Sequence, residues 1–128
     1  MSNPPKVLVI DDDQLVLDAL ADLLKMEGYE VAGFASPLKA FDRLQTREYD
    51  AALIDLGMAE MNGRTVLRRL HAMDEDLPCI VLTGDATTET AQDCIRLGAT
   101  EVVVKPFNMA KLRGPLRHAV DVRRLRRG

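Results

Sequence analysis

Acidic, hydroxyl and ammonium side chains follow four apolar stretches of the sequence, each at the point where the stretch ends. They belong to Asp11, Asp12, Asp13, Asp55, Thr83 and Lys105. Crowded carboxylates repel one another, and a hard divalent cation such as Mg²⁺, which prefers oxygen ligands, relieves that repulsion. A carboxylate cluster with a hydroxyl and an ammonium nearby therefore indicates a site that could move a phosphoryl group.

The apolar stretches that precede these residues are predicted to be parallel strands. They cover residues 7–10, 51–54, 79–82 and 102–104. The stretches are apolar throughout rather than alternating, which is typical of strands covered on both faces by helices. The carboxyl ends of such strands lie at one edge of the sheet, where open α/β sheets bind ligands. We therefore expect the polar side chains to converge there.

Strands and helices are predicted to alternate along the whole chain. Strands are expected at residues 6–11, 29–34, 49–55, 78–83 and 101–105, and helices at 14–27, 37–47, 63–73, 87–97 and 109–124. Ser36 and Asn108 are predicted helix caps, and Gly28 and Gly98 are predicted helix ends. Short connections favour right-handed crossovers. The predicted fold class is α/β, a doubly wound five-stranded parallel sheet of order 2-1-3-4-5 with five helices, flavodoxin-like.

Length and composition predict one domain with an aliphatic core. The chain has 128 residues, of which 47% are hydrophobic and 4% aromatic. No apolar run approaches the roughly 20 residues that cross a bilayer, and the N-terminus lacks a signal-peptide pattern. Cys79 and Cys94 have no metal-type spacing and are expected to be reduced, small apolar residues. A cytoplasmic protein is expected.

The charge is unevenly distributed. Residues 109–128 hold seven basic residues and one acid, a charge of +6, which leaves −9 for the rest of a chain of net charge −3. We favour a solvated end of the last helix, where basic residues suit the helix dipole. Contact with nucleic acid or an acidic membrane surface is the alternative. Residues 1–128 are expected to be one domain with its core at about 6–120, and 121–128 to be a basic tail or the start of a linker.

Four motifs together resemble the receiver domain of bacterial response regulators in two-component signalling. They are the acidic pair Asp11-Asp12, the pattern Asp-Leu-x-Met-x-x-Met-Asn-Gly at 55–63, Thr83-Gly84, and Lys105-Pro106-Phe107. Each motif alone is weak, but all four occur in order at predicted strand ends, and the resemblance covers about residues 6–120. It implies that Asp55 accepts a phosphoryl group from a histidine kinase or histidine phosphotransfer protein and forms an aspartyl phosphate.

The resemblance also implies a Mg²⁺ site. Asp12 and Asp55 would ligate the ion directly, Asp11 would act through water, and Gly57 would offer its backbone carbonyl. The ion would neutralise charge that develops during phosphoryl transfer. Asp13 is instead expected to cap the following helix, because a carboxylate there can accept from free backbone N–H groups.

The phosphoryl group itself is expected to meet three further residues. By resemblance, Lys105 would pair with one phosphoryl oxygen and Thr83 would donate its hydroxyl to another. Gly84 would leave space for the group. A cis peptide bond before Pro106 would aim Lys105 inward, although cis is normally the minority state.

Several positions depart from the family pattern. Val102 stands where the family usually has an aromatic that swings inward, so switching through an aromatic is in doubt, because a β-branched residue has little χ1 freedom. Ala59 replaces a usual proline, which predicts a looser loop. Gly57 and Asp85 flank the entrance, where Asp85 could position a water or repel an anion.

The remaining residues of the 55–63 motif are expected to be structural. Asn62 is predicted to cap the next helix, and Gly63 to supply an unusual backbone angle. Met58 and Met61 are expected to pack in the loop, because thioethers are soft ligands and Mg²⁺ is hard.

Three other functions fit the sequence less well. A non-phosphorylated receiver-like interaction module usually loses an acid or the lysine, and this chain keeps them. A haloacid-dehalogenase-type hydrolase would want Thr or Val at Leu15, and a cap domain is missing. A flavodoxin needs Ser/Thr donors for its flavin phosphate where this chain has three acids.

The expected role is signalling rather than enzymatic, since the domain would catalyse only its own phosphotransfer and slow autodephosphorylation. By resemblance, the kinase would contact residues 14–27 and 105–108. An output domain or partner protein would read the face formed by residues 87 to about 124, through a shift between two conformations. No DNA-recognition helix follows Lys105, so direct binding of nucleic acid by this chain is not expected. A membrane is not an expected partner either. Dimerisation through the same face is left open.

Overall fold

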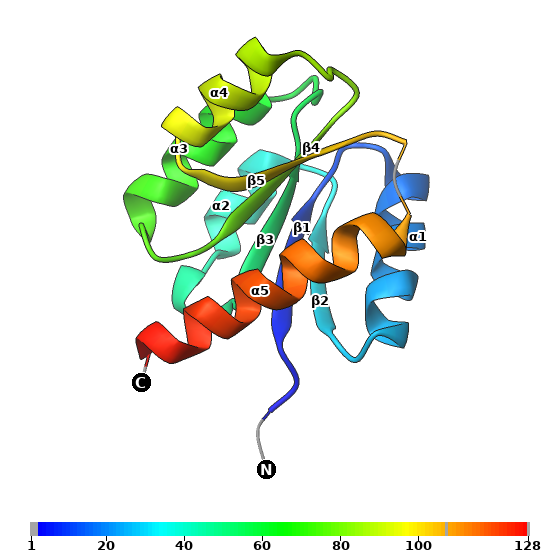
Figure 1. Cartoon of the computed structure of the whole chain (residues 1–128), viewed down its shortest axis with the longest axis vertical. Coiled ribbons are helices and arrows are strands. Elements are labelled where there is room, and N and C mark those ends of the chain that lie inside the picture. Colours follow the sequence, from blue (N-terminus) through cyan, green and yellow to red (C-terminus); the bar gives the residue numbers. More distant parts are fainter. Residues whose placement is uncertain (1–2, 107, 128) are drawn as a thin grey trace.

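A computed structural model describes residues 3–106 and 108–127 and contains one parallel sheet of order β2-β1-β3-β4-β5 (Figure 1). The strands are β1 (Lys6–Ile10), β2 (Glu30–Phe34), β3 (Ala51–Asp55), β4 (Cys79–Thr83) and β5 (Ala99–Val104). The helices are α1 (Gln14–Met26), α2 (Pro37–Arg43), α3 (Gly63–Met73), α4 (Thr88–Arg96) and α5 (Met109–Arg127). The predicted fold class and strand order are confirmed.

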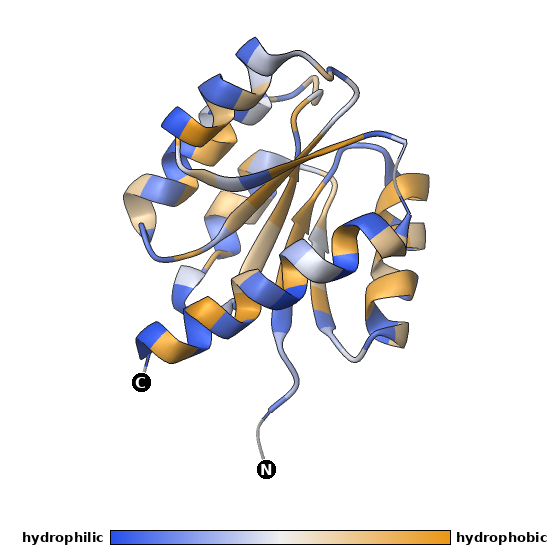
Figure 2. Cartoon of the chain, in the orientation of Figure 1, coloured by the Kyte–Doolittle hydropathy of each residue, from blue (hydrophilic) through white to orange (hydrophobic). Residues whose placement is uncertain are grey.

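Helices cover both faces of the sheet, α1 and α5 on one and α2, α3 and α4 on the other (Figure 1). Alternate residues of each strand enter opposite cores. In β1, Leu8 and Ile10 join the core under α2–α4, whereas Val7 and Val9 join the core under α1 and α5. All four are fully buried. Figure 2 accordingly shows central strands that are largely hydrophobic and helices that carry both kinds of residue.

The predicted caps are present at the helix starts. The side chains of Asp13, Ser36 and Asn62 accept hydrogen bonds from backbone N–H groups of the first turns of α1, α2 and α3. Asn108 accepts from the Lys111 N–H at 3.2 Å in the same way. Such bonds satisfy donors that have no partner within the helix, so the sequence located these starts to within a residue.

Two glycines end helices in the left-handed region, as predicted. Gly28 has φ +94° and Gly98 has φ +116°. Gly63 differs, because it is not among the positive-φ glycines, so the expected unusual backbone angle is wrong. A Cβ on Gly63 would lie 2.6 Å from both the Cα and the carbonyl oxygen of Leu56. Glycine is needed there for close approach of the backbone at the end of β3.

Two helix ends differ from the prediction. α2 stops at Arg43, and a short 3₁₀ helix occupies Thr46–Glu48, where a continuous helix to residue 47 was expected. The Thr46 carbonyl accepts a hydrogen bond from Arg123, 77 residues away, so a distant contact favours the altered backbone. α5 continues to Arg127, three residues beyond its predicted end.

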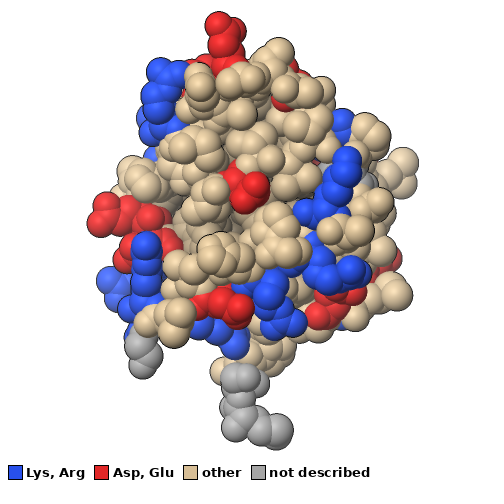
Figure 3. Space-filling model, viewed as in Figure 1, with Lys and Arg blue, Asp and Glu red and all other residues tan. Residues whose placement is uncertain are grey.

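Five of the six arginines of α5 form ion pairs with acids elsewhere in the chain. Ion pairs join Arg113 to Glu27, Arg123 to Asp74, Arg124 and Arg127 to Asp50, and Arg126 to Asp76. Figure 3 shows basic and acidic side chains intermixed over the face that carries α5. Arg123 is only 3% exposed. The expectation of a solvated basic helix end is therefore wrong for Arg123, because the fold brings Asp74 against it.

Two further expectations concern the cysteines and membranes. Cys79 and Cys94 are both buried and free. Burial raises the pKa of the Cys79 thiol to about 12, which keeps it in the unreactive protonated form. Within the described residues, every helix is too short or too polar to span a bilayer.

Candidate functional site

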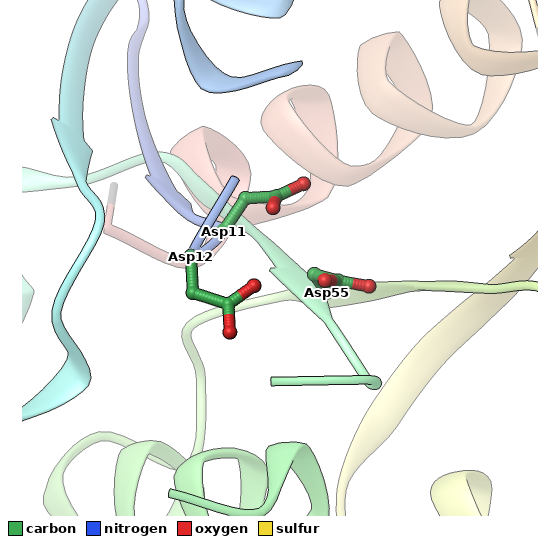
Figure 4. Close-up of side chains that lie close together, drawn as sticks. All are labelled: Asp11, Asp12 and Asp55. Atoms are coloured by element: carbon green, nitrogen blue, oxygen red, sulfur yellow. The ribbon is translucent and has the colours of Figure 1, made fainter. Parts of the chain in front are cut away.

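Three carboxylates meet where β1 and β3 end, at the predicted edge of the sheet. Asp11 and Asp12 directly follow β1, and Asp55 is the last residue of β3 (Figure 4). One carboxylate oxygen from each residue lies within 4.8 Å of the other two. Asp11 and Asp55 are buried and Asp12 is exposed. The two buried anions have lost most of their water, so this cluster suits a cation.

The surroundings of Asp11 disfavour the ionised form of its carboxyl group. Its Oδ1 accepts a hydrogen bond of 2.9 Å from the Asp13 N–H. Its Oδ2 is buried and has no hydrogen-bond partner in the described part of the chain. Burial raises the pKa of Asp11, and the nearby charge of Asp55 raises it further. A buried carboxylate oxygen without a partner, beside two other carboxylates, fits the hard-oxygen donor set of Mg²⁺.

Asp12 is tied to the loop between β3 and α3. Its Oδ2 accepts a hydrogen bond of 2.9 Å from the backbone N–H of Ala59. Proline, which has no N–H, could not make this bond. Glu60 in the same loop accepts from the Ser36 hydroxyl at 2.6 Å and from the Leu38 N–H at 3.1 Å. These hydrogen bonds connect the loop to Asp12 and to the start of α2.

The Asp55 carboxylate forms an ion pair with Lys105. The Lys105 ammonium donates to Asp55 Oδ1 at 3.0 Å, and the Gly57 N–H donates to the same oxygen at 3.3 Å. The peptide bond between Lys105 and Pro106 is cis, as the resemblance implied. The Lys105 N–H bonds to the Thr83 carbonyl at 2.7 Å, which fixes the end of β5 against β4. Phe107, the last residue of that motif, lies outside the described residues.

Asp55 opens onto a depression of about 400 Å³. The depression is lined by Asp55, Leu56, Gly57, Arg64, Thr83, Gly84, Asp85 and Lys105. A Cβ on Gly84 would meet no atom within 4 Å, so open space adjoins this residue. The sequence reasoning missed Arg64. The one feature of the sequence that could have pointed to Arg64 is its position directly after Asn62-Gly63, at the start of α3.

Thr83 and Asp85 are linked to the start of α4. The Asp85 N–H donates to Thr83 Oγ1 at 3.0 Å. The Asp85 carboxylate accepts from the Thr90 hydroxyl at 2.7 Å and from the Thr87 N–H at 2.9 Å. The Thr90 hydrogen bond is the main cause of a lowered pKa at Asp85. Asp85 thus anchors a loop to α4, a function that its position at the entrance had not predicted.

Val102 lies on β5 opposite Val81 of β4. It is half-buried and packs against the core under α2–α4. Val102 thus contributes an aliphatic side chain to that core at the position where the family usually has an aromatic. Hydrogen bonds from Asp85 to Thr83 and from Thr90 to Asp85 connect the site to α4.

Comparison with known proteins agrees with the fold and the site. A model of the response regulator receiver domain matches residues 7–117. The chain is 34% identical over 125 residues to the C4-dicarboxylate transport transcriptional regulatory protein DctD of Rhizobium meliloti (strain 1021), covering 98% of this chain and 27% of that protein. It is 35% identical to the transcriptional regulatory protein PrrA of Mycobacterium bovis, covering 84% of this chain and 46% of that protein. The chain thus spans between about a quarter and a half of the length of these curated relatives.

Solved structures give the same result. The signal receiver domain of an HD domain-containing protein from Pseudomonas fluorescens Pf-5 has a TM-score of 0.88 at 26% identity, covering 99% of this chain and 94% of that one. A CheY-like receiver domain protein from Methanospirillum hungatei JF-1 has a TM-score of 0.85 at 26% identity, covering 96% and 98%. The motifs, the sheet order and the family match agree, and the chain belongs to the receiver domains of two-component response regulators.

Proposed function

We propose that this receiver domain accepts a phosphoryl group on Asp55 in the presence of Mg²⁺. The observation that carries the proposal is the position of the Asp55 carboxylate. It lies between the carboxylates of Asp11 and Asp12 and the Lys105 ammonium, which is 3.0 Å away, and it faces the depression beside Thr83. Three carboxylates that could hold a cation, and an ammonium paired with one of them, therefore lie at one edge of the sheet, which supports Asp55 as the acceptor.

The chemistry needs few groups because phosphoryl transfer is mainly a matter of position and charge. An Asp55 oxygen forms the new bond to phosphorus while the phosphorus–nitrogen bond of a phosphohistidine breaks and its electron pair stays with the imidazole. Mg²⁺, held by Asp12 and Asp55, by Asp11 through water and by the Gly57 carbonyl, would supply neutralising charge. Lys105 and the Thr83 hydroxyl would bind phosphoryl oxygens, and Gly84 would leave them room.

The proposed donor is a sensor histidine kinase or a histidine phosphotransfer protein. An apolar groove of about 510 Å³ lies between α1 and the loop after β5, lined by Val16, Ala19, Leu20, Leu23, Lys105 and Pro106. Leu15 and Met26 of α1 are each 82% exposed. A groove that includes Lys105 would bring a docked histidine next to Asp55, which supports docking at α1.

The first test compares the protein with an Asp55→Asn variant. In Mg²⁺ and acetyl phosphate, we expect the protein to gain the mass of one phosphoryl group. In Mg²⁺ and beryllofluoride, we expect it to unfold at a higher temperature. The variant should do neither, because its amide cannot form an acyl phosphate, although it should still unfold cooperatively. A protein that responds to neither reagent would overturn the proposal and favour a non-phosphorylated interaction module.

We propose that the output is read at the face formed by α4, β5 and α5, by an output domain or a partner protein. With Val102 in place of an aromatic, the Thr83–Asp85–Thr90 hydrogen bonds support a path to α4. Backbone amide chemical shifts with and without beryllofluoride test this proposal. Shifts should spread from the site into α4, and shifts confined to the loops around Asp11, Asp55 and Thr83 would contradict switching at this face.

A further inference from the structure

Arg64 is a cation at the acceptor site that the residue roles above do not use. It is the second residue of α3, and it lines the depression together with Asp55, Thr83 and Lys105. Its side chain is half-buried. Its backbone N–H bonds to Asn62, but its guanidinium makes no hydrogen bond or ion pair with any residue among 3–106 and 108–127.

The other charged groups of the depression already have partners. The Lys105 ammonium lies 3.0 Å from Asp55, and the Asp85 carboxylate accepts from Thr87 and Thr90. The Thr90 hydrogen bond is the main cause of the lowered pKa of Asp85, and the charge of Arg64 lowers it further, which is consistent with both side chains lining the same depression. Within the described lining, the guanidinium is therefore the cation whose donors stay available to a ligand.

A guanidinium binds a phosphoryl group more specifically than other cationic side chains do. Its planar fork of N–H donors can bind two phosphoryl oxygens at once, which a lysine ammonium cannot do. The site also carries the four carboxylates of Asp11, Asp12, Asp55 and Asp85. An incoming phosphoryl dianion meets their repulsion, and a second cation beside Lys105 would offset part of it.

We propose that Arg64 binds oxygens of the phosphoryl group, in the incoming donor and in the aspartyl phosphate. This inference rests on the proposed role of Asp55. Arg64 is then a specificity-determining residue that raises affinity for small dianionic phosphodonors and for the bound phosphoryl group. Arg64 would not ligate Mg²⁺, because both are positively charged.

Arg64→Gln tests the inference, with Arg68→Gln as the matched control. Arg68 lies one turn further along α3, is exposed, and is absent from the depression. Phosphorylation rate is measured against acetyl phosphate concentration in Mg²⁺, and beryllofluoride affinity is measured by titration. Hydrogen bonds to charged groups suggest that Arg64→Gln should raise the half-saturating concentration of both reagents by roughly 5- to 20-fold. Arg68→Gln should leave both values unchanged.

A further variant separates binding by Arg64 from a general effect of charge on α3. Arg64→Lys, which keeps the charge but loses the fork, should fall between the wild-type protein and Arg64→Gln. Equal affinities in Arg64→Gln and wild type would overturn the inference while leaving Asp55 as the acceptor. Equal losses in Arg64→Gln and Arg68→Gln would also overturn it, because general charge on α3 would then explain the effect. A wild-type protein that binds neither reagent would overturn the proposed function, and the inference with it.

Discussion

Asp11 is a buried carboxylate whose position weakens the fold and suits a bound cation. It is buried, its Oδ2 has no partner among the described residues, and its pKa is raised chiefly by burial. A raised pKa in an acid means that the fold disfavours the ionised form. An unsatisfied buried polar group costs about 1–3 kcal/mol, so this carboxylate should weaken the fold when no cation is bound.

We therefore expect Asp11→Asn to raise the free energy of unfolding in metal-free buffer by about 1–2 kcal/mol, because the amide is neutral and can donate to a neighbouring carboxylate. The same variant should lose most of the stabilisation that Mg²⁺ gives the wild-type protein. Urea unfolding with and without Mg²⁺ measures both effects. Asp22→Asn, an exposed acid on α1, is the control and should change neither. An Asp11→Asn variant less stable than wild type without metal would contradict the argument.

The sequence identified the acids of the site but not all of their contacts. Asp13 was predicted as a helix cap and is one, because capping depends on residues close in the chain. The bond from Ala59 to Asp12 spans 47 residues, and no local sequence pattern predicts it. Arg64 escaped notice because its role depends on which loops face α3, which only the folded chain defines.

At the scale of elements, the start of α3 packs closely against the end of β3 because Gly63 has no side chain. A Cβ on Gly63 would lie 2.6 Å from the Leu56 carbonyl oxygen and 2.8 Å from that of Asp55. These are backbone atoms, which cannot turn aside as a flexible side chain could. The positions of α3 and Asp55 are therefore coupled.

Gly63→Ala should displace the end of β3 and cost about 1–3 kcal/mol of stability, as overpacking usually does. It should also reduce the thermal stabilisation by beryllofluoride, because Asp55 moves with the strand. Gly57→Ala is the stability control, since a Cβ there meets nothing within 4 Å. Denaturant unfolding compares the two variants. Equal effects of both substitutions on stability would show that the contact at Gly63 is not the cause.

Element boundaries were predictable where local signals define them. α1, α3 and α4 begin at capping residues, and Gly28 and Gly98 follow the ends of two of them. The predicted end of α2 was wrong, because the apolar pattern continues beyond Arg43 whereas the backbone changes direction there to meet α5. A contact between residues 77 positions apart leaves no trace in a local pattern.

For the molecule as a whole, Arg123 joins three distant segments at the end of the sheet opposite the acceptor site. Its guanidinium donates to Asp74 at 2.6 and 3.0 Å and to the carbonyls of Thr46 and Tyr49 at 3.1 and 3.2 Å. Its side chain is 4% exposed and that of Asp74 is 14% exposed. The charge asymmetry of the sequence is thus used within the fold, where α5 is attached to the start of β3 and the end of α3.

Arg123→Met should cost about 3–5 kcal/mol at neutral pH, because it leaves a largely buried carboxylate without its cation. It also removes one of the two donors to each of the Thr46 and Tyr49 carbonyls. Arg126→Gln, whose partner Asp76 is exposed, should cost less than about 1 kcal/mol. The Arg123 hydrogen bond lowers the pKa of Asp74. The contribution of this pair is therefore present above the unfolded-state pKa of about 3.9 and is lost as pH falls through the lower native value.

Urea unfolding at neutral and acidic pH tests this argument. The stability difference between wild type and Arg123→Met should narrow as pH falls below about 4, since Asp74 then becomes protonated in the unfolded chain and in the variant. Beryllofluoride affinity of the folded variant should stay unchanged, because none of its contacts lines the acceptor depression. A gap that widens in acid, or an equal loss in Arg126→Gln, would show that the Arg123–Asp74 pair is not what holds α5 to the domain.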